Sequence, residues 1–299
     1  MDDMGPESDI GDLAVRLHDH PTEGDFQAAP VSLRDYGEGI SVAGRRAATR
    51  GVLDSAIKRI GPPTLYGGDA AGPVVRWRDD RRTLLLDHGG QSLRFCVRRT
   101  PELEAGERAR FVPGSRTDPL GFYAGLPYMW QLYGGGGGSP PLGFPSVPTA
   151  SDWSWLEGSL TQLLSGWWEQ VPAQLGHGDA VGFNIDFRGE VQRSAERVSV
   201  LCEQPGGLVL LVDDRSTRGG TPSEVMRSRG WQDRMRGWWQ RVFHDLGDAG
   251  AAVAARMAID EIRLRGAPDP AALAVSDVAP EVAGLLVLPG LALRGRRIP

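Results

Sequence analysis

The best candidates for acid–base chemistry in this sequence are a histidine and an aspartate two residues apart, His177 and Asp179. They fall between a predicted helix and a predicted strand, and loops on rigid elements often carry functional side chains. An enzyme built on this pair, or on the nearby carboxylates Asp186 and Glu190, would show a deep pocket at His177 with a perturbed acid beside it. The alternative is a solvated turn, and we predict no catalytic residue.

Metal and phosphate motifs are absent from the sequence. It contains no His-x-x-x-His, no Cys-x-x-Cys and no EF-hand loop pattern, which disfavours structural zinc and calcium sites. The glycine run Gly134–Gly138 leads into Ser-Pro-Pro. It therefore lacks the Gly-Lys-Ser/Thr ending of a phosphate-binding loop. We predict no metal site and no cofactor.

Tryptophan is the more informative residue, since nine occur beside a single lysine. Adjacent tryptophans on a helix cannot both face one core stripe, so one of each pair should lie at the helix flank. Large side chains that fill a helix-on-sheet core are one interpretation. The other is an apolar groove or a dimer surface, because tryptophan is enriched where one side is packed and the other is wet. On the second interpretation the partner-binding residues are Trp155, Trp167, Trp168, Trp231, Trp238 and Trp239.

The elements that would position these side chains are a helix followed by three strands, and this order occurs twice. Apolar residues at helical spacing predict the helices, and alternation with period two predicts strands with one buried face. The first set is a helix from Arg45 to Ile60 and strands at Val74–Arg78, Thr83–Asp87 and Leu93–Arg98. The second is a helix from Ser154 to Val171 and strands at Ala180–Phe187, Val198–Glu203 and Leu208–Asp213. We therefore expect an α+β fold of two lobes, each a helix plus an antiparallel β-meander packed with helices, related as a quasi-repeat.

The rest of the second lobe is predicted to be helical. Helices are expected at Ser223–Arg229, Met235–Leu246 and Ala249–Arg265, and Asp269-Pro270 should begin another short one. The resulting domain organisation is an acidic flexible arm (1–40), a first lobe (41–112), a Gly/Pro-rich linker (113–150), a second lobe (151–280) and a C-terminal tail (281–299).

Charge and cysteine content exclude several classes of partner. The net charge of −5 is concentrated in the first thirty residues, and the arginines elsewhere are scattered, so a nucleic-acid partner is not expected. No apolar run approaches the ~20 residues of a membrane span, so no membrane partner is expected either. The acidic N-terminus does not resemble a signal peptide, and Cys96 and Cys202 form no disulfide framework. A cytoplasmic location is expected.

The second lobe, over about residues 151–280, resembles the actinobacterial domains grouped with type III secretion chaperones and YbjN-like proteins (TY-Chap). The resemblance lies in the aromatic opening helix, the antiparallel strands to Asp213, the Gly230-Trp231 step and the Ala-rich closing helix that leads to Pro268-Asp269-Pro270. It implies an antiparallel sheet covered by helices that binds a peptide of a client protein, often as a dimer. The long connector and the leader depart from the pattern of the family.

Three functions remain open at this point. A chaperone-like adaptor would hold a peptide client on a sheet edge or a Trp-lined groove, as a monomer or homodimer, without catalysis. An immunity protein or inhibitor would plug a toxin, with the acidic arm as a mimic of nucleic acid. An uncharacterised hydrolase-type enzyme would use His177, Asp179 or the carboxylates beyond them. We expect the adaptor.

Overall fold

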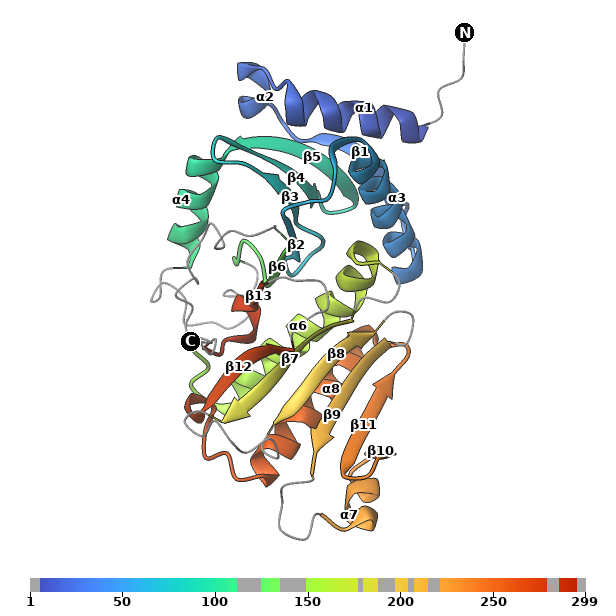
Figure 1. Ribbon diagram of the computed structural model, residues 1–299, viewed down its shortest axis with the longest axis vertical. Coiled ribbons are helices and arrows are strands. Elements are labelled where there is room, and N and C mark those ends of the chain that lie inside the picture. The colour runs from blue at the N-terminus through green and yellow to red at the C-terminus, as the bar shows by residue number, and fades with distance from the viewer. Residues whose placement is uncertain are drawn as a thin grey trace.

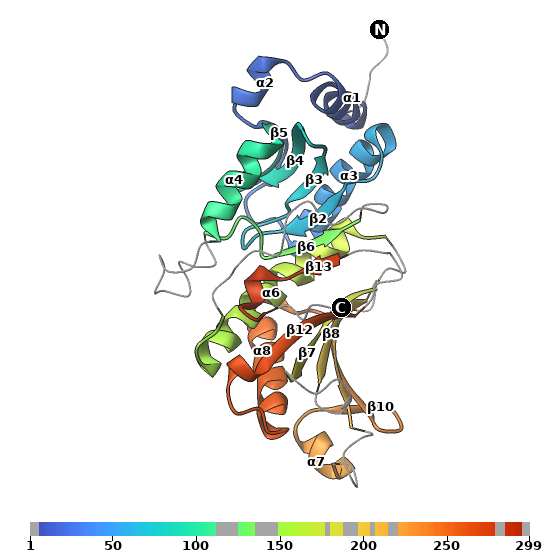
Figure 2. The same ribbon diagram turned by 60° about the vertical axis from the view of Figure 1, so that its left-hand side comes forward.

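Two antiparallel sheets form the framework of the protein (Figures 1 and 2). The computed structural model describes residues 6–111, 125–134, 149–176, 180–187, 197–203, 207–214, 221–278 and 285–294. Within these residues the sheets have seven and six strands, and helices lie against both of them. The α+β fold class is therefore confirmed, whereas the quasi-repeat of two lobes stays a prediction.

The seven-stranded sheet, called sheet A, has the strand order β1-β5-β4-β3-β2-β6-β13. Its strands are β1 (Val31–Asp35), β2 (Leu65–Gly68), β3 (Val75–Arg78), β4 (Arg82–His88), β5 (Ser92–Arg99), β6 (Trp130–Tyr133) and β13 (Leu285–Val287). Alternation along β3 to β5 turns Trp77, Leu84 and Phe95 into one core with helix α3 (Val42–Ile60). Arg76 and Arg78 face the opposite way, toward helix α4 (Thr100–Arg110).

The leader is folded from residue 6 onward, which corrects the prediction of a flexible arm. It forms helix α1 (Pro6–Asp19), helix α2 (Glu23–Gln27) and strand β1, which pairs with β5 (Figure 1). Ala14 and Leu17 are buried in the core of sheet A. The apolar positions of α1 are helically spaced, but the surrounding acids hide this pattern in the sequence.

The six-stranded sheet, called sheet B, has the strand order β10-β11-β9-β8-β7-β12. Its strands are β7 (Ala180–Phe187), β8 (Val198–Glu203), β9 (Gly207–Asp213), β10 (Gln232–Met235), β11 (Trp238–Phe243) and β12 (Leu273–Val278). Helix α7 (Ser223–Ser228) precedes β10, and helix α8 (Gly247–Leu264) follows β11. Before β12, Asp269 accepts a hydrogen bond from the backbone of Ala272 and caps the 3₁₀ turn η2 (Pro270–Ala272), where a short helix was predicted.

The prediction of a helix over Met235–Leu246 is wrong, because this segment is half of a β-hairpin. Gly237 has φ 77°, a left-handed conformation that glycine adopts without strain, and it lies between β10 and β11. The aromatic and β-branched residues from Trp238 to Phe243 suit a pleated strand, and all six pair with β9. The alternation of this strand places Trp239 and Arg241 on the face that looks toward α8.

Helix α6 (Trp153–Gln174) connects the two sheets (Figures 1 and 2). Its apolar stripe packs against sheet B and α8, while Gln174 donates to the carbonyl of Gly67 on β2 and accepts from its N–H, at 2.7 and 2.9 Å. A Cβ at Gly68 would lie 1.9 Å from Oε1 of Gln170, so the glycine permits this close approach. The helix therefore forms part of the core around both sheets.

The predicted linker and tail also contribute to sheet A. β6 comes from the segment read as a linker and β13 from the segment read as a tail, and the two strands pair with each other. Trp130 is buried, and the 3₁₀ turn η3 (Pro289–Leu291) places the carbonyl of Leu291 3.0 Å from Oγ of Ser159 on α6. The domain boundaries drawn from the sequence therefore do not coincide with the sheets. Most of the glycine run lies outside the described residues.

Helices α3 and α6, which open the two predicted lobes, pack against each other. Arg45 makes an ion pair with Glu169, with Nε 2.7 Å from Oε1. Arg50 donates to the carbonyl of Pro172 at 2.9 Å, near the end of α6. These contacts fix α6 at one end, so that its other end is held over sheet B.

Candidate functional site

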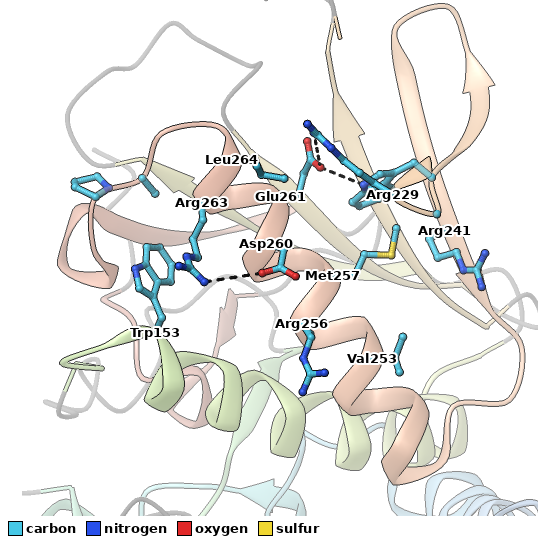
Figure 3. Close-up of a pocket in the computed structure, with 14 residues that line it drawn as sticks. Trp153, Arg229, Arg241, Val253, Arg256, Met257, Asp260, Glu261, Arg263 and Leu264 are labelled. Atoms are coloured by element: carbon cyan, nitrogen blue, oxygen red, sulfur yellow. Dashed lines mark hydrogen bonds and ion pairs between the residues drawn. The ribbon is translucent and has the colours of Figure 1, made fainter. Parts of the chain in front are cut away.

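A groove of about 920 Å³ lies over the outer face of α8 (Figure 3). The beginning of α6 lies on one side of it, and the segment from Arg229 to Trp231 with strand β11 on the other. We call this hollow the α8 groove and define it by its principal lining residues, Trp153, Arg241, Val253, Arg256, Met257 and Leu264.

The sequence of α8 separates an inner face from an outer one. The inner face is built from small residues and two isoleucines, all buried: Ala251, Ala254, Ala255, Ala258, Ile259 and Ile262. Small side chains let α8 approach α6 and sheet B closely. The outer face carries Val253 and Leu264, which are 58% and 60% exposed, with Met257 half-buried between them. Such apolar residues on an outer face are available for contact with another molecule.

Aromatic side chains form the edge and the floor of the groove. Trp153 is the first residue of α6, where Asp152 caps the helix by accepting from the N–H of Trp155 at 2.9 Å, a bond that lowers the pKa of Asp152. Trp231 is buried, and its indole N–H donates to Glu261 at 3.2 Å. The cap fixes the start of α6, and the indole hydrogen bond holds the Trp231 ring in place.

Arginines dominate the charge of the lining, which contains four of them and two acids. Glu261 is already neutralised, because Arg265 lies 2.9 Å and Arg229 3.6 Å from its carboxylate. Arg256 reaches Glu157 at 3.1 Å, but the side chain of this arginine is largely exposed. Exposed pairs of this kind contribute only about 0–1 kcal/mol and can be exchanged for others at little cost.

Two further arginines lie on opposite sides of the groove (Figure 3). Arg263 stands over the ring of Trp153, 5.7 Å from its centre, and is 4.0 Å from Asp260. Arg241 contacts the ring of Phe243 and has no carboxylate partner among the residues that the structure describes. The groove thus combines apolar surface with positive charge that is weakly paired or, at Arg241, unpaired.

A buried polar network supports the far end of α8. Arg265 lies 3.3 Å from Asp214 and also donates to the carbonyl of Asp213 at 3.3 Å. Asp214 accepts from the backbone of Thr221 at 2.6 Å, before helix α7. Because these groups are buried and satisfied by one another, we assign them to the structure that fixes the end of α8 and not to binding.

The six tryptophans predicted to bind a partner lie in different surroundings. Trp167 is fully buried and stacks on Phe183 with ring centres 5.0 Å apart. Trp168 faces α3, where Arg46 lies 4.3 Å from its ring centre, and Trp239 is buried in the core of sheet B. Trp155 and Trp238 are half-buried outside the lining of the groove.

Among those six tryptophans, only Trp231 lines the α8 groove, and Trp153 lines it without having been predicted. The signal that could have found Trp153 is its place at the first turn of a helix whose stripe begins at Leu156. The groove arginines are scattered in the sequence, and only the fold brings together positions 229, 241, 256 and 263.

The structure does not bring the candidate catalytic residues together within the residues that it describes. His177, Asp179 and Glu190 lie outside the described residues. Asp186 is buried, accepts from Oγ of Ser276 at 2.6 Å and pairs with Arg197 at 3.2 Å, so its hydrogen bonds are used within the fold. Within the described ranges, no three histidine, cysteine or acidic side chains are grouped to hold a metal ion.

Another histidine–aspartate pair lies beside sheet A. His88 places Nε2 at 2.8 and 3.0 Å from the two carboxylate oxygens of Asp69. The same carboxylate accepts from the backbone N–H groups of Ala71 and Gly72, so it closes the turn between β2 and β3. This pair therefore has a local structural role.

Comparisons with known proteins place the chain in no family. No family model matches it, no curated protein matches it, and no solved structure matches it. In the part of the chain that the structure describes, none of the helices has the length and apolar character needed to cross a membrane.

Proposed function

We propose that this chain is a non-catalytic, chaperone-like adaptor that binds a segment of a partner protein in the α8 groove. The observation that carries the proposal is the exposed apolar stripe of α8 with arginines on both sides (Figure 3). Burial of a valine or leucine side chain contributes about 1.5–3 kcal/mol. A partner that covers Val253 and Leu264 would therefore gain a substantial share of its binding energy there.

The chemistry of the lining supports binding more than catalysis. The described lining residues include no histidine, cysteine, serine, threonine, tyrosine or lysine, which leaves two carboxylates as the candidate nucleophiles among them. The acids are Asp260, which is exposed, and Glu261, which is held by arginines. Arginine does not lose its proton in the physiological range and serves here to recognise negative charge.

We keep the function implied by the resemblance to the TY-Chap domains. We place partner binding in the α8 groove instead of at the tryptophan pairs. The toxin inhibitor is less well supported, because two acids of the leader already make ion pairs with arginines of the chain. Asp12 lies 2.6 Å from Arg59 and Asp25 2.9 Å from Arg16. Two buried thiols that form no disulfide, Cys96 and Cys202, support a cytoplasmic setting.

Site-specific photo-crosslinking in the native host tests this function. A photoreactive phenylalanine replaces Val253 in the groove or, as a matched control, the exposed Val31 on β1 of sheet A. We expect one protein to be crosslinked from position 253 and not from position 31. A second substitution, Leu264→Glu, should abolish the product while the melting temperature is retained. Equal products from both positions, or crosslinks only to a second copy of this chain, would contradict the proposal.

A further inference from the structure

From the spacing and charge of the α8 groove we infer that its occupant is an acidic amphipathic helix of the partner protein. This inference rests on the function proposed above and specifies the partner's chemistry. The outer face of α8 places Val253, Met257, Asp260 and Leu264 at intervals of four, three and four residues. Such spacing keeps a stripe on one side of a helix for about 16 Å, at 1.5 Å per residue. A second helix lying along this stripe would meet it at each turn.

Two arginines lie beside the apolar stripe of α8, spaced as charged residues are in a pair of packed helices. Arg256 and Arg263 are one heptad apart, which corresponds to about 10.5 Å along the axis. In coiled coils, charged residues at this period beside the apolar seam select the partner and its orientation. A helix on α8 would therefore meet two positive charges along one flank, and acids one heptad apart would match them.

The opposite flank is positive as well. Arg241 projects from β11 on the other side of Met257, whereas Arg229 on that side already pairs with Glu261 at 3.6 Å (Figure 3). Since Arg241 has no carboxylate partner within the described residues, an incoming acid would not have to displace one. At Arg256 and Arg263 the existing pairs are exposed, and their exchange for a partner's carboxylates costs little.

Asp260 argues against a uniformly acidic or nucleic-acid occupant. It lies within the apolar stripe, so a carboxylate or phosphate placed directly opposite would be repelled. The occupant should therefore carry its acids at the edges, and a neutral or basic residue opposite Asp260. A polar residue at one position of a helix seam also fixes the register of the pair.

Synthetic peptides of about three heptads test the inference with the full chain. All share one leucine stripe. The first carries glutamate at the flanking positions, the second carries lysine there, and the third is the glutamate peptide with two central prolines that break the helix. Dissociation constants are measured by titration calorimetry for the native chain and for a variant with Arg241→Glu, Arg256→Glu and Arg263→Glu. We expect the glutamate peptide to bind at least about tenfold more tightly than either of the others, and the variant to prefer the lysine peptide.

The outcomes separate this inference from the proposed function. Equal binding of the glutamate and lysine peptides, or no binding of the glutamate peptide, would overturn the acidic occupant and leave the crosslinking result standing. Equal binding of the proline peptide would overturn the helix. Binding that Leu264→Glu does not weaken would contradict the groove itself, and with it the proposed function. Circular dichroism and the melting temperature of each variant show that the fold is retained.

Discussion

Arginine has opposite surroundings in two regions of the molecule. Between sheet A and α4, Arg76 makes two hydrogen bonds to Glu107, at 2.7 and 2.9 Å, and both side chains are almost fully buried, at 2% and 3% exposure. Arg78 beside it reaches Glu104 at 2.6 Å. In the α8 groove, Arg256 and Arg263 are exposed and make only surface ion pairs, and Arg241 has no carboxylate partner within the described residues.

This difference assigns the two clusters to different tasks. A buried arginine must be neutralised by the fold itself, because an uncompensated charge in the interior is strongly destabilising. An arginine beside exposed apolar surface costs the fold little and can be neutralised by another molecule. Sheet A therefore holds a closed cluster, formed by Arg76, Arg78, Glu104 and Glu107. The α8 groove presents an open cluster, formed by Arg241, Arg256 and Arg263.

The largest expected effect is the loss of one partner in the closed cluster. Glu107→Gln keeps the volume of the side chain but leaves the charge of Arg76 uncompensated, so the free energy of unfolding should fall by about 3–5 kcal/mol. Chemical denaturation followed by circular dichroism measures this change. The matched control is Glu157→Gln, which removes the exposed partner of Arg256 and should cost less than about 1 kcal/mol. Similar losses in both variants would remove the distinction between the clusters.

The two faces of α8 should respond differently to added volume. Ala258→Leu inserts a larger side chain into the fully buried inner face and should destabilise the protein by about 1–3 kcal/mol. Val253→Leu makes a smaller change on the exposed outer face and should alter stability by less than about 0.5 kcal/mol. Thermal denaturation of both variants checks the pair. A large loss at position 253 would mean that the outer face is packed within the fold.

Removal of an open-cluster arginine should separate binding from stability. Arg241→Ala deletes a charge that has no carboxylate partner within the described residues, so the free energy of unfolding should change by less than about 0.5 kcal/mol. Affinity for the crosslinked partner should fall by about fivefold to tenfold, which corresponds to about 1–1.4 kcal/mol of binding energy. Calorimetric titration beside thermal denaturation measures both quantities. Unchanged affinity would exclude Arg241 from the binding surface.

The smallest effect concerns a thiol of the closed region. Burial and the nearby Asp87 raise the pKa of Cys96 to about 11, so at pH 8 only about one molecule in a thousand carries the thiolate. Cys96 should react with a disulfide reagent only after unfolding, whereas a cysteine introduced by Val253→Cys should react at once. Because the folded pKa lies above that of the unfolded thiol, the contribution of Cys96 to stability is present below about pH 8.5 and declines as pH rises toward 11. Rapid reaction of Cys96 in the folded protein at pH 8 would mean that its thiol is not buried.

The fold could be predicted from the sequence where pattern and pairing are local. Helices α3, α6 and α8 and the strands on either side of short turns follow from spacing alone. β6 and β13 could not be predicted, because each is short and pairs with a strand far away in the chain. The segment of β11 is predicted as a helix because its apolar residues fit both periods, and Gly237 alone marks the turn.

The candidate site was only partly visible in the sequence. Trp231 was singled out there and does line the groove, but the reason given, a tryptophan at a helix flank, does not apply, since Trp231 precedes a strand. The arginines come from three separate segments, and no local sequence pattern predicts that they lie close together in the fold. The apolar residues of the exposed stripe of α8 can be seen in the sequence. The alanines on the other face predict a buried helix, which hides the stripe.

Binding of the partner in the α8 groove can be followed through the methyl signal of Met257, which lies in the groove. The chain is labelled with ¹³C-methyl methionine, and spectra are recorded as the crosslinked segment of the partner is added. We expect the Met257 signal to shift in step with binding, while the signals of buried Met226 and of exposed Met235, outside the groove, stay in place. A complex that forms with Met257 unmoved would contradict binding in the α8 groove.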